Sequence, residues 1–226
     1  MTRKLLVFAP HPDDEVIGCV GPIRRALSCG TSVVIVYVTS GDQGVDGCCG
    51  AQREAEAVEA LRALGAGRSR LIFMKIPDGG ICPEDPGQFE AVLALIRDER
   101  PDMVILPHEA EGSFDHVQTH RLVWRALAMS GSRNHPRAGA PHWVPTALSY
   151  EVWTPMASPA HFVDLDGDDA EAKAVALSCY RSQSKGDSQP EYAGVGGLSL
   201  ARFRGAMTIG GHREAFGVLR LGEVSW

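Results

Sequence analysis

Short apolar runs alternate with helical stretches along the first 130 residues. Residues 4–9 and 32–39 are almost wholly apolar, and the second run is rich in β-branched side chains, which is typical of strands covered on both faces. Residues 70–76 and 102–106 repeat this pattern. Apolar positions at helical spacing fill the segments between the runs, over residues 16–29, 51–64, 87–99 and 115–129. This order predicts an α/β fold with a Rossmann-like, mostly parallel, doubly wound sheet.

The last third of the chain has a weaker pattern. Residues 132–145 are rich in Pro, His and Gly and predict a loop, whereas residues 146–153 predict a strand and residues 168–182 a helix. Residues 184–197 are polar and Gly-rich, which is typical of a mobile loop. We therefore expect an irregular C-terminal extension to the sheet.

Length and composition fit one domain. The chain has 226 residues, and its hydrophobic content of 44% is enough to build a sizeable core and argues against global disorder. No boundary to a second domain is evident. We predict one domain over residues 1–226, with the Rossmann-like core in residues 1–130 and substrate-site elements in residues 131–226.

The charge pattern favours a small-molecule substrate over nucleic acid or membrane. The net charge is -6, and no block of five or more basic residues occurs. The apolar run near the N-terminus is only about five residues long, too short for a signal peptide, and no stretch approaches the roughly 20 apolar residues of a membrane span. These features predict a cytoplasmic protein and are compatible with a homo-oligomer.

The six cysteines do not form a recognisable metal site. No Cys-x-x-Cys pair occurs among them, which argues against zinc held by thiolates. Cys48 and Cys49 are adjacent in the Gly-rich segment 41–50. A reactive pair is one interpretation, and two unreactive thiols in a loop are the favoured one.

Two groups of polar residues follow predicted strands. The segment His11-Pro12-Asp13-Asp14-Glu15 comes after the strand at 4–9, and a run from His108 to His120 comes after the strand at 102–106. Ligands of open parallel sheets bind beyond the carboxyl ends of the strands, where the strand order reverses. If these two strands flank that point, the two distant segments meet in one crevice.

The first group suits a metal. His11 and Asp14 offer an imidazole and a carboxylate, both good zinc ligands, and a third ligand from the second group leaves a position open for water. Zinc lowers the pKa of bound water to about 7, and Asp13 beside it would act as the general base. The competing interpretation makes Asp13 and Asp14 helix-capping residues, but this does not explain the nearby histidine.

The roles within the second group stay open at this point. Asp115 is a plausible helix N-cap and also a plausible partner that orients His116. His116 and His120 are four residues apart and share a helix face, so spacing alone does not decide which of them binds the metal.

These motifs resemble the PIG-L/LmbE-like deacetylases, a family that includes enzymes removing acetyl groups from N-acetylglucosaminyl compounds. The specific matches are Ala-Pro-His-Pro-Asp-Asp-Glu at 9–15 and Asp-His-Val-Gln-Thr-His at 115–120. Weaker matches are Arg53 to Glu56, Pro77-Asp78-Gly79, Tyr150-Glu151-Val152-Trp153, and the run from Lys173 through Ser182-Gln183. Their order follows the family over nearly the whole chain.

The resemblance implies a zinc-dependent hydrolase of an N-acetyl amino sugar or a glycosylated small molecule. It implies His11, Asp14 and His116 as ligands of zinc or another divalent metal, and Asp13 as the general base. It further implies that Arg53 and Asp78 face the sugar, although from the residues alone they are equally a surface pair or a turn residue.

One position departs from the family. The histidine usually found three residues before the second metal histidine, which stabilises the developing oxyanion, is replaced here by Ser113. Loss of one oxyanion donor typically costs about 10²–10³ in rate. Three explanations are open: His108 or His120 compensates as a catalytic residue, the substrate differs, or the activity is low. For His120, a purely structural role in its helix is as good an interpretation.

Three alternative functions follow from these observations. An amidase acting on thiol–sugar or natural-product conjugates would share the metal motif. A metal-binding, non-catalytic homologue would explain Ser113 but not the retained Asp13. A nucleotide-binding Rossmann domain is disfavoured because no Gly-x-Gly-x-x-Gly follows the first strand and two carboxylates there would repel a pyrophosphate.

Overall fold

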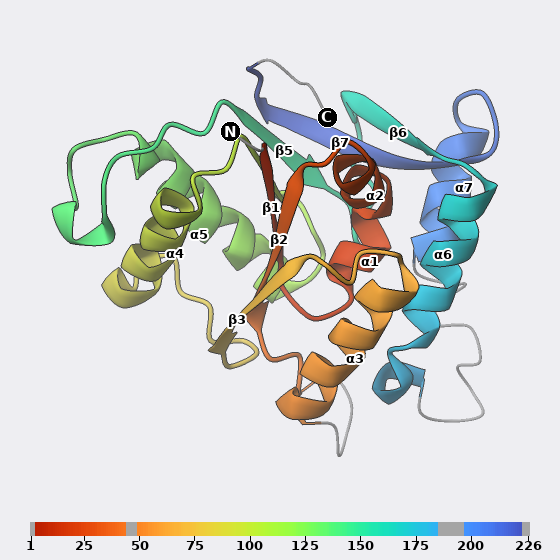
Figure 1. Cartoon of the computed structure of the whole chain (residues 1–226), viewed down its shortest axis with the longest axis horizontal. Coiled ribbons are helices and arrows are strands. Elements are labelled where there is room, and N and C mark those ends of the chain that lie inside the picture. The colour runs from red at the N-terminus through yellow and green to blue at the C-terminus, as the bar shows by residue number, and fades with distance from the viewer. Residues whose placement is uncertain (1–2, 44–48, 185–196, 223–226) are drawn as a thin grey trace.

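One seven-stranded sheet lies at the centre of the residues that the computed structural model describes, 3–43, 49–184 and 197–222 (Figure 1). The strand order is β3-β2-β1-β4-β5-β7-β6. The strands are β1 Lys4–Ala9, β2 Ser32–Thr39, β3 Arg70–Ile76, β4 Met103–Pro107, β5 Thr146–Tyr150, β6 His161–Leu165 and β7 His212–Arg220. β1 to β5 are parallel, and β7 runs antiparallel to both β5 and β6. The predicted mostly parallel, doubly wound sheet is confirmed.

Helices cover both faces of the sheet. Their bounds are α1 Asp14–Gly18, α2 Val20–Ser28, α3 Gly50–Ala63, α4 Pro86–Glu99, α5 Phe114–Ser130, α6 Gly167–Ser178 and α7 Ser199–Ala206, with short 3-10 turns at Pro136–Ala138 and Arg181–Ser184. α4 and α5 lie on one side, and α1, α2, α3, α6 and α7 on the other (Figure 1). No helix within the described residues is both long enough and apolar enough to cross a membrane.

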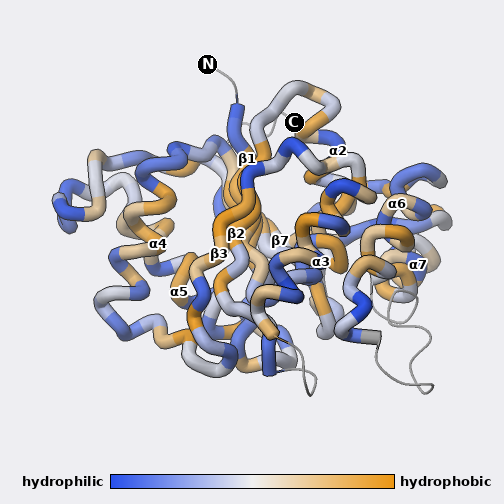
Figure 2. The backbone as a smooth tube through the Cα atoms, turned by 60° about the horizontal axis from the view of Figure 1, so that its bottom comes forward, coloured by the Kyte–Doolittle hydropathy of each residue, from blue (hydrophilic) through white to orange (hydrophobic). Residues whose placement is uncertain are grey.

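The strand residues alternate between two cores. Leu6 and Phe8 of β1 pack with the core under α4 and α5, whereas Leu5, Val7 and Ala9 pack with the core on the opposite face. β2 alternates in the same way, so both faces of each strand are buried. This explains why these runs are apolar without interruption, and the strands form the apolar centre of Figure 2.

The single helix expected over residues 16–29 is divided at Cys19 into two helices, α1 and α2. The carboxylate of Glu214 accepts hydrogen bonds from the backbone N–H groups of Val20 and Gly21, which begin α2. Lys173 donates to the Ile17 carbonyl and to Glu214. A buried ion pair from the C-terminal part of the chain therefore starts a new helix where the apolar spacing continues unbroken.

The C-terminal part is more regular than its sequence pattern indicated. β5 ends at Tyr150, three residues before the end of the predicted strand, and α6 ends at Ser178. β6, α7 and β7 were not expected, and the two strands extend the sheet beyond β5 to its edge. The loop predicted at 184–197 lies almost wholly outside the described residues, as does Cys48, while Cys49 is exposed.

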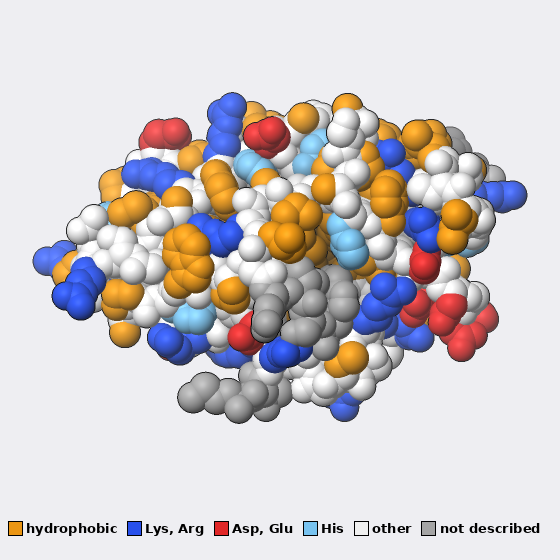
Figure 3. All heavy atoms as spheres, turned by 90° about the horizontal axis from the view of Figure 1, so that it is seen from above, with side chains coloured by type: hydrophobic (Ala, Val, Ile, Leu, Met, Phe, Trp, Pro, Cys, Tyr) orange, Lys and Arg blue, Asp and Glu red, His pale blue; other side chains and the backbone are white. Residues whose placement is uncertain are grey.

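The molecular face in Figure 3 carries a mixed surface. Basic side chains are scattered there among acidic and apolar ones and do not gather into one patch.

Candidate active site and metal centre

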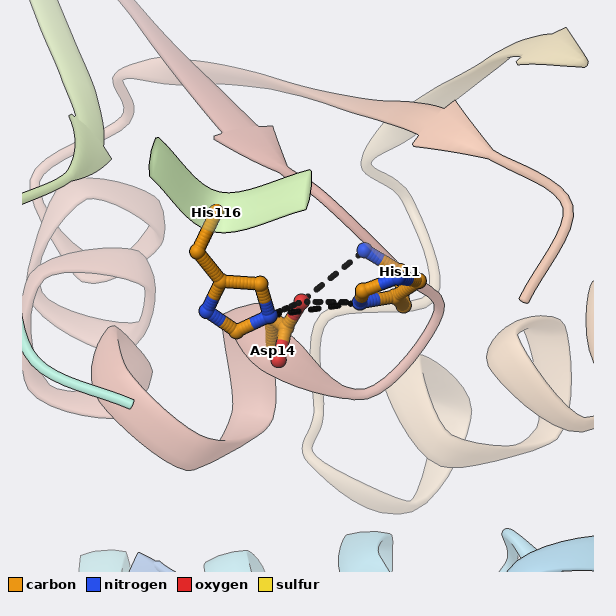
Figure 4. A group of neighbouring side chains, drawn as sticks. All are labelled: His11, Asp14 and His116. Atoms are coloured by element: carbon orange, nitrogen blue, oxygen red, sulfur yellow. Dashed lines mark hydrogen bonds and ion pairs between the residues drawn. The ribbon is translucent and has the colours of Figure 1, made fainter. Parts of the chain in front are cut away.

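The predicted metal ligands meet where β1 and β4 separate. These strands are parallel neighbours, but the chain leaves β1 for α1 and leaves β4 for α5, on opposite faces of the sheet. His11 lies in the turn after β1, Asp14 begins α1, and His116 lies in the first turn of α5. Figure 4 shows the three side chains pointing toward one another. The reversal of strand order thus brings the two segments into one crevice, as predicted.

The three donor atoms form a nearly equilateral triangle. His11 Nδ1 lies 3.3 Å from Asp14 Oδ2 and 3.2 Å from His116 Nε2, and His116 Nε2 lies 3.2 Å from Asp14 Oδ2. Tetrahedral ligands about 2.0–2.1 Å from zinc are separated from one another by about 3.3 Å. The spacing and the donor types of these residues therefore fit zinc.

The charges around this triangle favour a cation. Burial lowers the pKa of His11, but hydrogen bonds to Asp115 and Asp14 outweigh it and raise the pKa to about 10. Burial also lowers the pKa of His116, but the charge of Asp14 helps to raise it to about 9. Burial raises the pKa of Asp14, yet the two histidines hold it well below its usual range. Histidine pKa values raised by neighbouring carboxylates indicate a negative potential, which a divalent cation would also satisfy.

Two further carboxylates contact the outer nitrogens of the ligand histidines. Asp115 Oδ2 lies 3.2 Å from His11 Nε2 and accepts the Gly79 N–H, and Glu111 Oε2 lies 3.7 Å from His116 Nδ1. A hydrogen bond such as that between Asp115 and His11 fixes the ring orientation of a metal-binding histidine, whereas Glu111 is beyond hydrogen-bond distance from His116. Both interpretations of Asp115 made from the sequence need correction, because α5 is capped at Ser113 and Asp115 contacts His11.

Asp13 lies beside the triangle in an unusual backbone conformation. Its φ of 132° and ψ of -27° belong to a region that side-chain-bearing residues seldom adopt. Arg53 Nη2 donates to Asp13 Oδ2 at 3.0 Å and also to the Pro12 carbonyl. The Asp13 N–H donates to Glu15 Oε2 at 3.1 Å. Asp13 is therefore held through both its side chain and its backbone.

A pocket of about 170 Å³ opens over these groups. The residues that line it are His11, Asp13, Asp14, Gly41, Arg53, Asp78, Trp153 and Gln183. Trp153 is 47% exposed and follows β5, and Gln183 follows α6. The C-terminal third of the chain thus supplies part of the wall.

The two residues predicted to face the sugar do line this pocket, but each also has internal partners. Arg53 is only 2% exposed and is bonded to Asp13. Asp78 accepts the backbone N–H groups of Gly41 and Gln43, so it also shapes the loop after β2. Their contact with a substrate stays a prediction.

The residues expected to replace the missing histidine lie outside the pocket lining. His108 Nε2 lies 2.7 Å from the Thr154 carbonyl and 3.1 Å from Glu111 Oε1. His120 Nδ1 lies 2.8 Å from the Pro107 carbonyl. Ser113 is the half-buried N-cap of α5 and is also absent from the lining. A direct role for any of the three stays a prediction.

A larger cavity, of about 520 Å³, lies elsewhere. Its lining includes three arginines and three aspartates, Arg24, Arg25, Arg68, Asp164, Asp166 and Asp169. It shares no residue with the pocket over His11. Its arginines donate to backbone carbonyls at Leu64, Asp164 and Leu27, and Arg24 also pairs with Asp169.

Sequence reasoning did not single out Glu15 or Glu111. Glu15 is fully buried and accepts hydrogen bonds from the hydroxyl groups of Tyr37 and Tyr180. Burial raises the pKa of Glu15 to about 7. Glu111 accepts the Val152 N–H at 2.7 Å and so ties the loop after β4 to the loop after β5. Their positions in the sequence could have indicated them, because Glu15 follows the carboxyl end of β1 and Glu111 follows that of the neighbouring strand β4.

The chain is similar to known proteins in both sequence and fold. Residues 6–127, more than half of the chain, match the PIG-L family, described as GlcNAc-PI de-N-acetylase. A 1D-myo-inositol 2-acetamido-2-deoxy-alpha-D-glucopyranoside deacetylase from Rhodococcus opacus (strain B4) is 32% identical over 180 residues. That match covers 66% of this chain and 61% of the relative, so the chain spans less than two thirds of the relative's length.

Two solved structures are similar over almost the whole chain. A conserved protein from Thermus thermophilus has a TM-score of 0.84 and 31% identity, covering 98% of this chain and 97% of that one. The N,N'-diacetylchitobiose deacetylase from Pyrococcus horikoshii, solved with an inhibitor, has a TM-score of 0.81 and 25% identity. The match covers 96% of this chain and 84% of that one. The chain belongs to the PIG-L family, as its motifs at 9–15 and 115–120 indicated.

Proposed function

We propose that the protein is a zinc-dependent amide hydrolase that deacetylates an N-acetyl amino sugar or a glycosylated small molecule. The observation that carries this proposal is the triangle of His11, Asp14 and His116 with the Asp13 carboxylate beside it in one pocket. The relatives named as deacetylases of acetamido sugars support the choice of substrate class.

His11, Asp14 and His116 would hold the metal, which we propose to be zinc, with another divalent ion as the alternative. Zinc bound there lowers the pKa of a water ligand to about 7 and polarises the amide carbonyl. Asp13 takes the proton from the attacking water and delivers it to the leaving nitrogen, so that acetate and a free amine result. Arg53 keeps the Asp13 carboxylate in one orientation throughout.

The pocket suits one small ring. Its volume of about 170 Å³ is below the roughly 300–1,000 Å³ of pockets that enclose drug-sized ligands. We propose that it admits the acetamido group and its sugar ring, with Asp78 bonding to the sugar and Arg53 holding the Asp13 carboxylate. Trp153 offers an exposed aromatic face beside them. The aglycone would then lie outside, so a thiol–sugar or natural-product conjugate is compatible with the same site.

The alternative candidate is a metal-binding protein without catalysis. Ser113 favours it, because a serine is shorter than histidine and carries no charge to stabilise an oxyanion. The fixing of Asp13 by Arg53 and Glu15 favours catalysis, because a metal-binding role needs no ordered carboxylate beside the ligands.

Acetate release from defined substrates tests the proposal. Protein of known zinc content is incubated with N-acetylglucosamine, N-acetylglucosaminyl-inositol and diacetylchitobiose. We expect acetate from at least one of them, and a loss of about 10²–10⁴ in rate for Asp13→Asn with zinc retained. Failure of fully zinc-loaded protein to hydrolyse these or a wider panel of N-acyl sugars would favour the non-catalytic alternative.

We also propose that residues 1–226 act as one unit. Residues 1–130 supply the metal ligands, and residues 131–226 supply Trp153 and Gln183 to the pocket. The cytoplasmic location, the absence of nucleic-acid and membrane partners, and a homo-oligomeric state remain predictions.

A further inference from the structure

The backbone of Asp13 is held in a conformation that its own side chain disfavours. Its φ of 132° lies in the region that favours glycine. The Asp13 carbonyl accepts the N–H groups of Val16 and Ile17, both at 2.9 Å, and so begins α1. The N–H of Asp13 points the other way and needs its own acceptor, because the residue is only 4% exposed.

Glu15 supplies that acceptor and is itself fixed by two tyrosines. Its Oε2 accepts the Asp13 N–H at 3.1 Å. Its Oε1 accepts the hydroxyl of Tyr37 at 2.8 Å and that of Tyr180 at 2.9 Å. Tyr37 belongs to β2 and Tyr180 follows α6, and both are buried, so Glu15 is anchored to two distant parts of the chain.

We propose that Glu15 is a positioning residue for the general base, which holds the Asp13 backbone so that the Asp13 carboxylate meets Arg53 and the pocket. The proposal rests on the proposed hydrolase function. Glu15 is absent from the metal-ligand group and from the pocket lining, so its contribution passes through Asp13. A displacement of about 1 Å at a catalytic group can cost about 10² in rate.

The competing view is that Glu15 only satisfies buried hydroxyl groups. In this view Glu15 accepts hydrogen bonds from the hydroxyls of Tyr37 and Tyr180 and has no effect on Asp13. The bond from the Asp13 N–H is the feature that this view leaves unexplained. The two views differ in whether the effect of changing Glu15 depends on the Asp13 carboxylate.

Glu15→Gln, made in the wild type and in Asp13→Asn, separates them. The amide keeps the shape of the side chain but offers only one acceptor oxygen, for which the Asp13 N–H and the two tyrosine hydroxyls compete. Glu15→Met, which offers no strong acceptor to either, is made in the same two backgrounds and judged by the same criteria. We expect kcat to fall about 10- to 100-fold, KM to change less than about threefold and zinc content to stay constant. In Asp13→Asn, Glu15→Gln should cause no further loss of the residual rate.

Glu214→Gln is the matched control. Glu214 is also buried, and it accepts the N–H groups of Val20 and Gly21 and the ammonium of Lys173, but not the Asp13 N–H. We expect it to lower the melting temperature while kcat stays within about threefold of wild type. An equal loss of kcat in Glu214→Gln, or an equal loss from Glu15→Gln with and without the Asp13 carboxylate, would overturn the positioning role.

A crystal structure of Glu15→Met, in which the Asp13 N–H has lost its acceptor, gives a readout that does not depend on activity. We expect φ of Asp13 to leave the positive region, or the bond to Arg53 to break, while the triangle of His11, Asp14 and His116 is kept. An unchanged Asp13 would overturn the proposal even if the protein turned out not to be a hydrolase. If Glu15→Gln does not fold, the pair Tyr37→Phe and Tyr180→Phe, which frees Glu15 from its anchors, is compared in the same two backgrounds with the same criteria.

Discussion

Arg53 Nη2 donates to Asp13 Oδ2 at 3.0 Å, and both side chains are almost fully buried. This ion pair joins the start of α3 to the turn that carries the candidate general base. The family resemblance implied that Arg53 faces the sugar, and in the structure Arg53 is bonded to the candidate base. Arg53 is therefore expected to act on the chemical step more than on binding.

Arg53→Lys should lower kcat by about 10-fold or more and leave KM within about threefold. Lysine keeps the charge but not the planar group that reaches the Asp13 carboxylate and the Pro12 carbonyl together. Steady-state kinetics on the best substrate measures the two constants. A rise in KM with unchanged kcat would instead assign Arg53 to sugar binding.

Ser113→His should raise the rate by about 10- to 100-fold if nothing now replaces the missing donor. An oxyanion donor is typically worth about 10²–10³, and a reintroduced one seldom recovers the full effect. His108 and His120 are bonded to the Thr154 and Pro107 carbonyls and lie outside the pocket lining. An unchanged or lower rate would show that another group already stabilises the oxyanion.

Removal of the metal should destabilise the fold. A ligand present at about 100 times its Kd stabilises by about 2.7 kcal/mol, which corresponds to about 5–10 °C for a chain of this size. We expect a chelator to lower the melting temperature by that amount and added zinc to restore it. In His116→Ala the shift should be absent, and a chelator effect of the same size there would place the metal at another site.

His120 should make the fold sensitive to mild acid. Burial lowers the pKa of His120 below its usual value of 6.5, although the Pro107 carbonyl opposes this. At a pH between 6.5 and the lower pKa of His120 in the folded protein, the unfolded chain binds more protons than the folded protein does. The free energy of unfolding therefore falls as the pH drops below 6.5. Urea titrations at about pH 7 and about pH 5 should show a smaller difference for His120→Asn than for the wild type. The same difference in both proteins would contradict the buried neutral state of His120.

The first four strands and the face that carries the site were predictable from local pattern. β1 and β2 are buried on both sides, so nearly every residue in them is apolar and the runs are easily seen. β7 was missed because it is only partly buried and carries His212, Arg213 and Glu214 at its start. The break at Cys19 depends on Glu214 and Lys173, which lie far along the chain, so no local pattern contains it.

The candidate site was predictable as far as the metal motif. His11, Asp14 and the segment from His108 to His120 follow strand ends, and chain topology brings them together. The choice of His116 over His120 came from the family resemblance, because their spacing leaves both open. The outer partners were not predictable in the same way. Asp115 was interpreted as a helix N-cap or as the partner of His116, but it contacts His11, and the N-cap of α5 is Ser113. Glu15 was passed over because its partners Tyr37 and Tyr180 come from separate elements.

Anomalous diffraction at the zinc edge tests the central claim most directly. It is measured on crystals of the wild type and of Asp13→Asn, and acetate release is measured on the same protein preparations. We predict one zinc per chain in both proteins, at about 2.0–2.2 Å from His11 Nδ1, Asp14 and His116 Nε2, with acetate released by the wild type alone. A zinc-soaked crystal with no ion between these three residues, or an Asp13→Asn variant as active as the wild type, would contradict it.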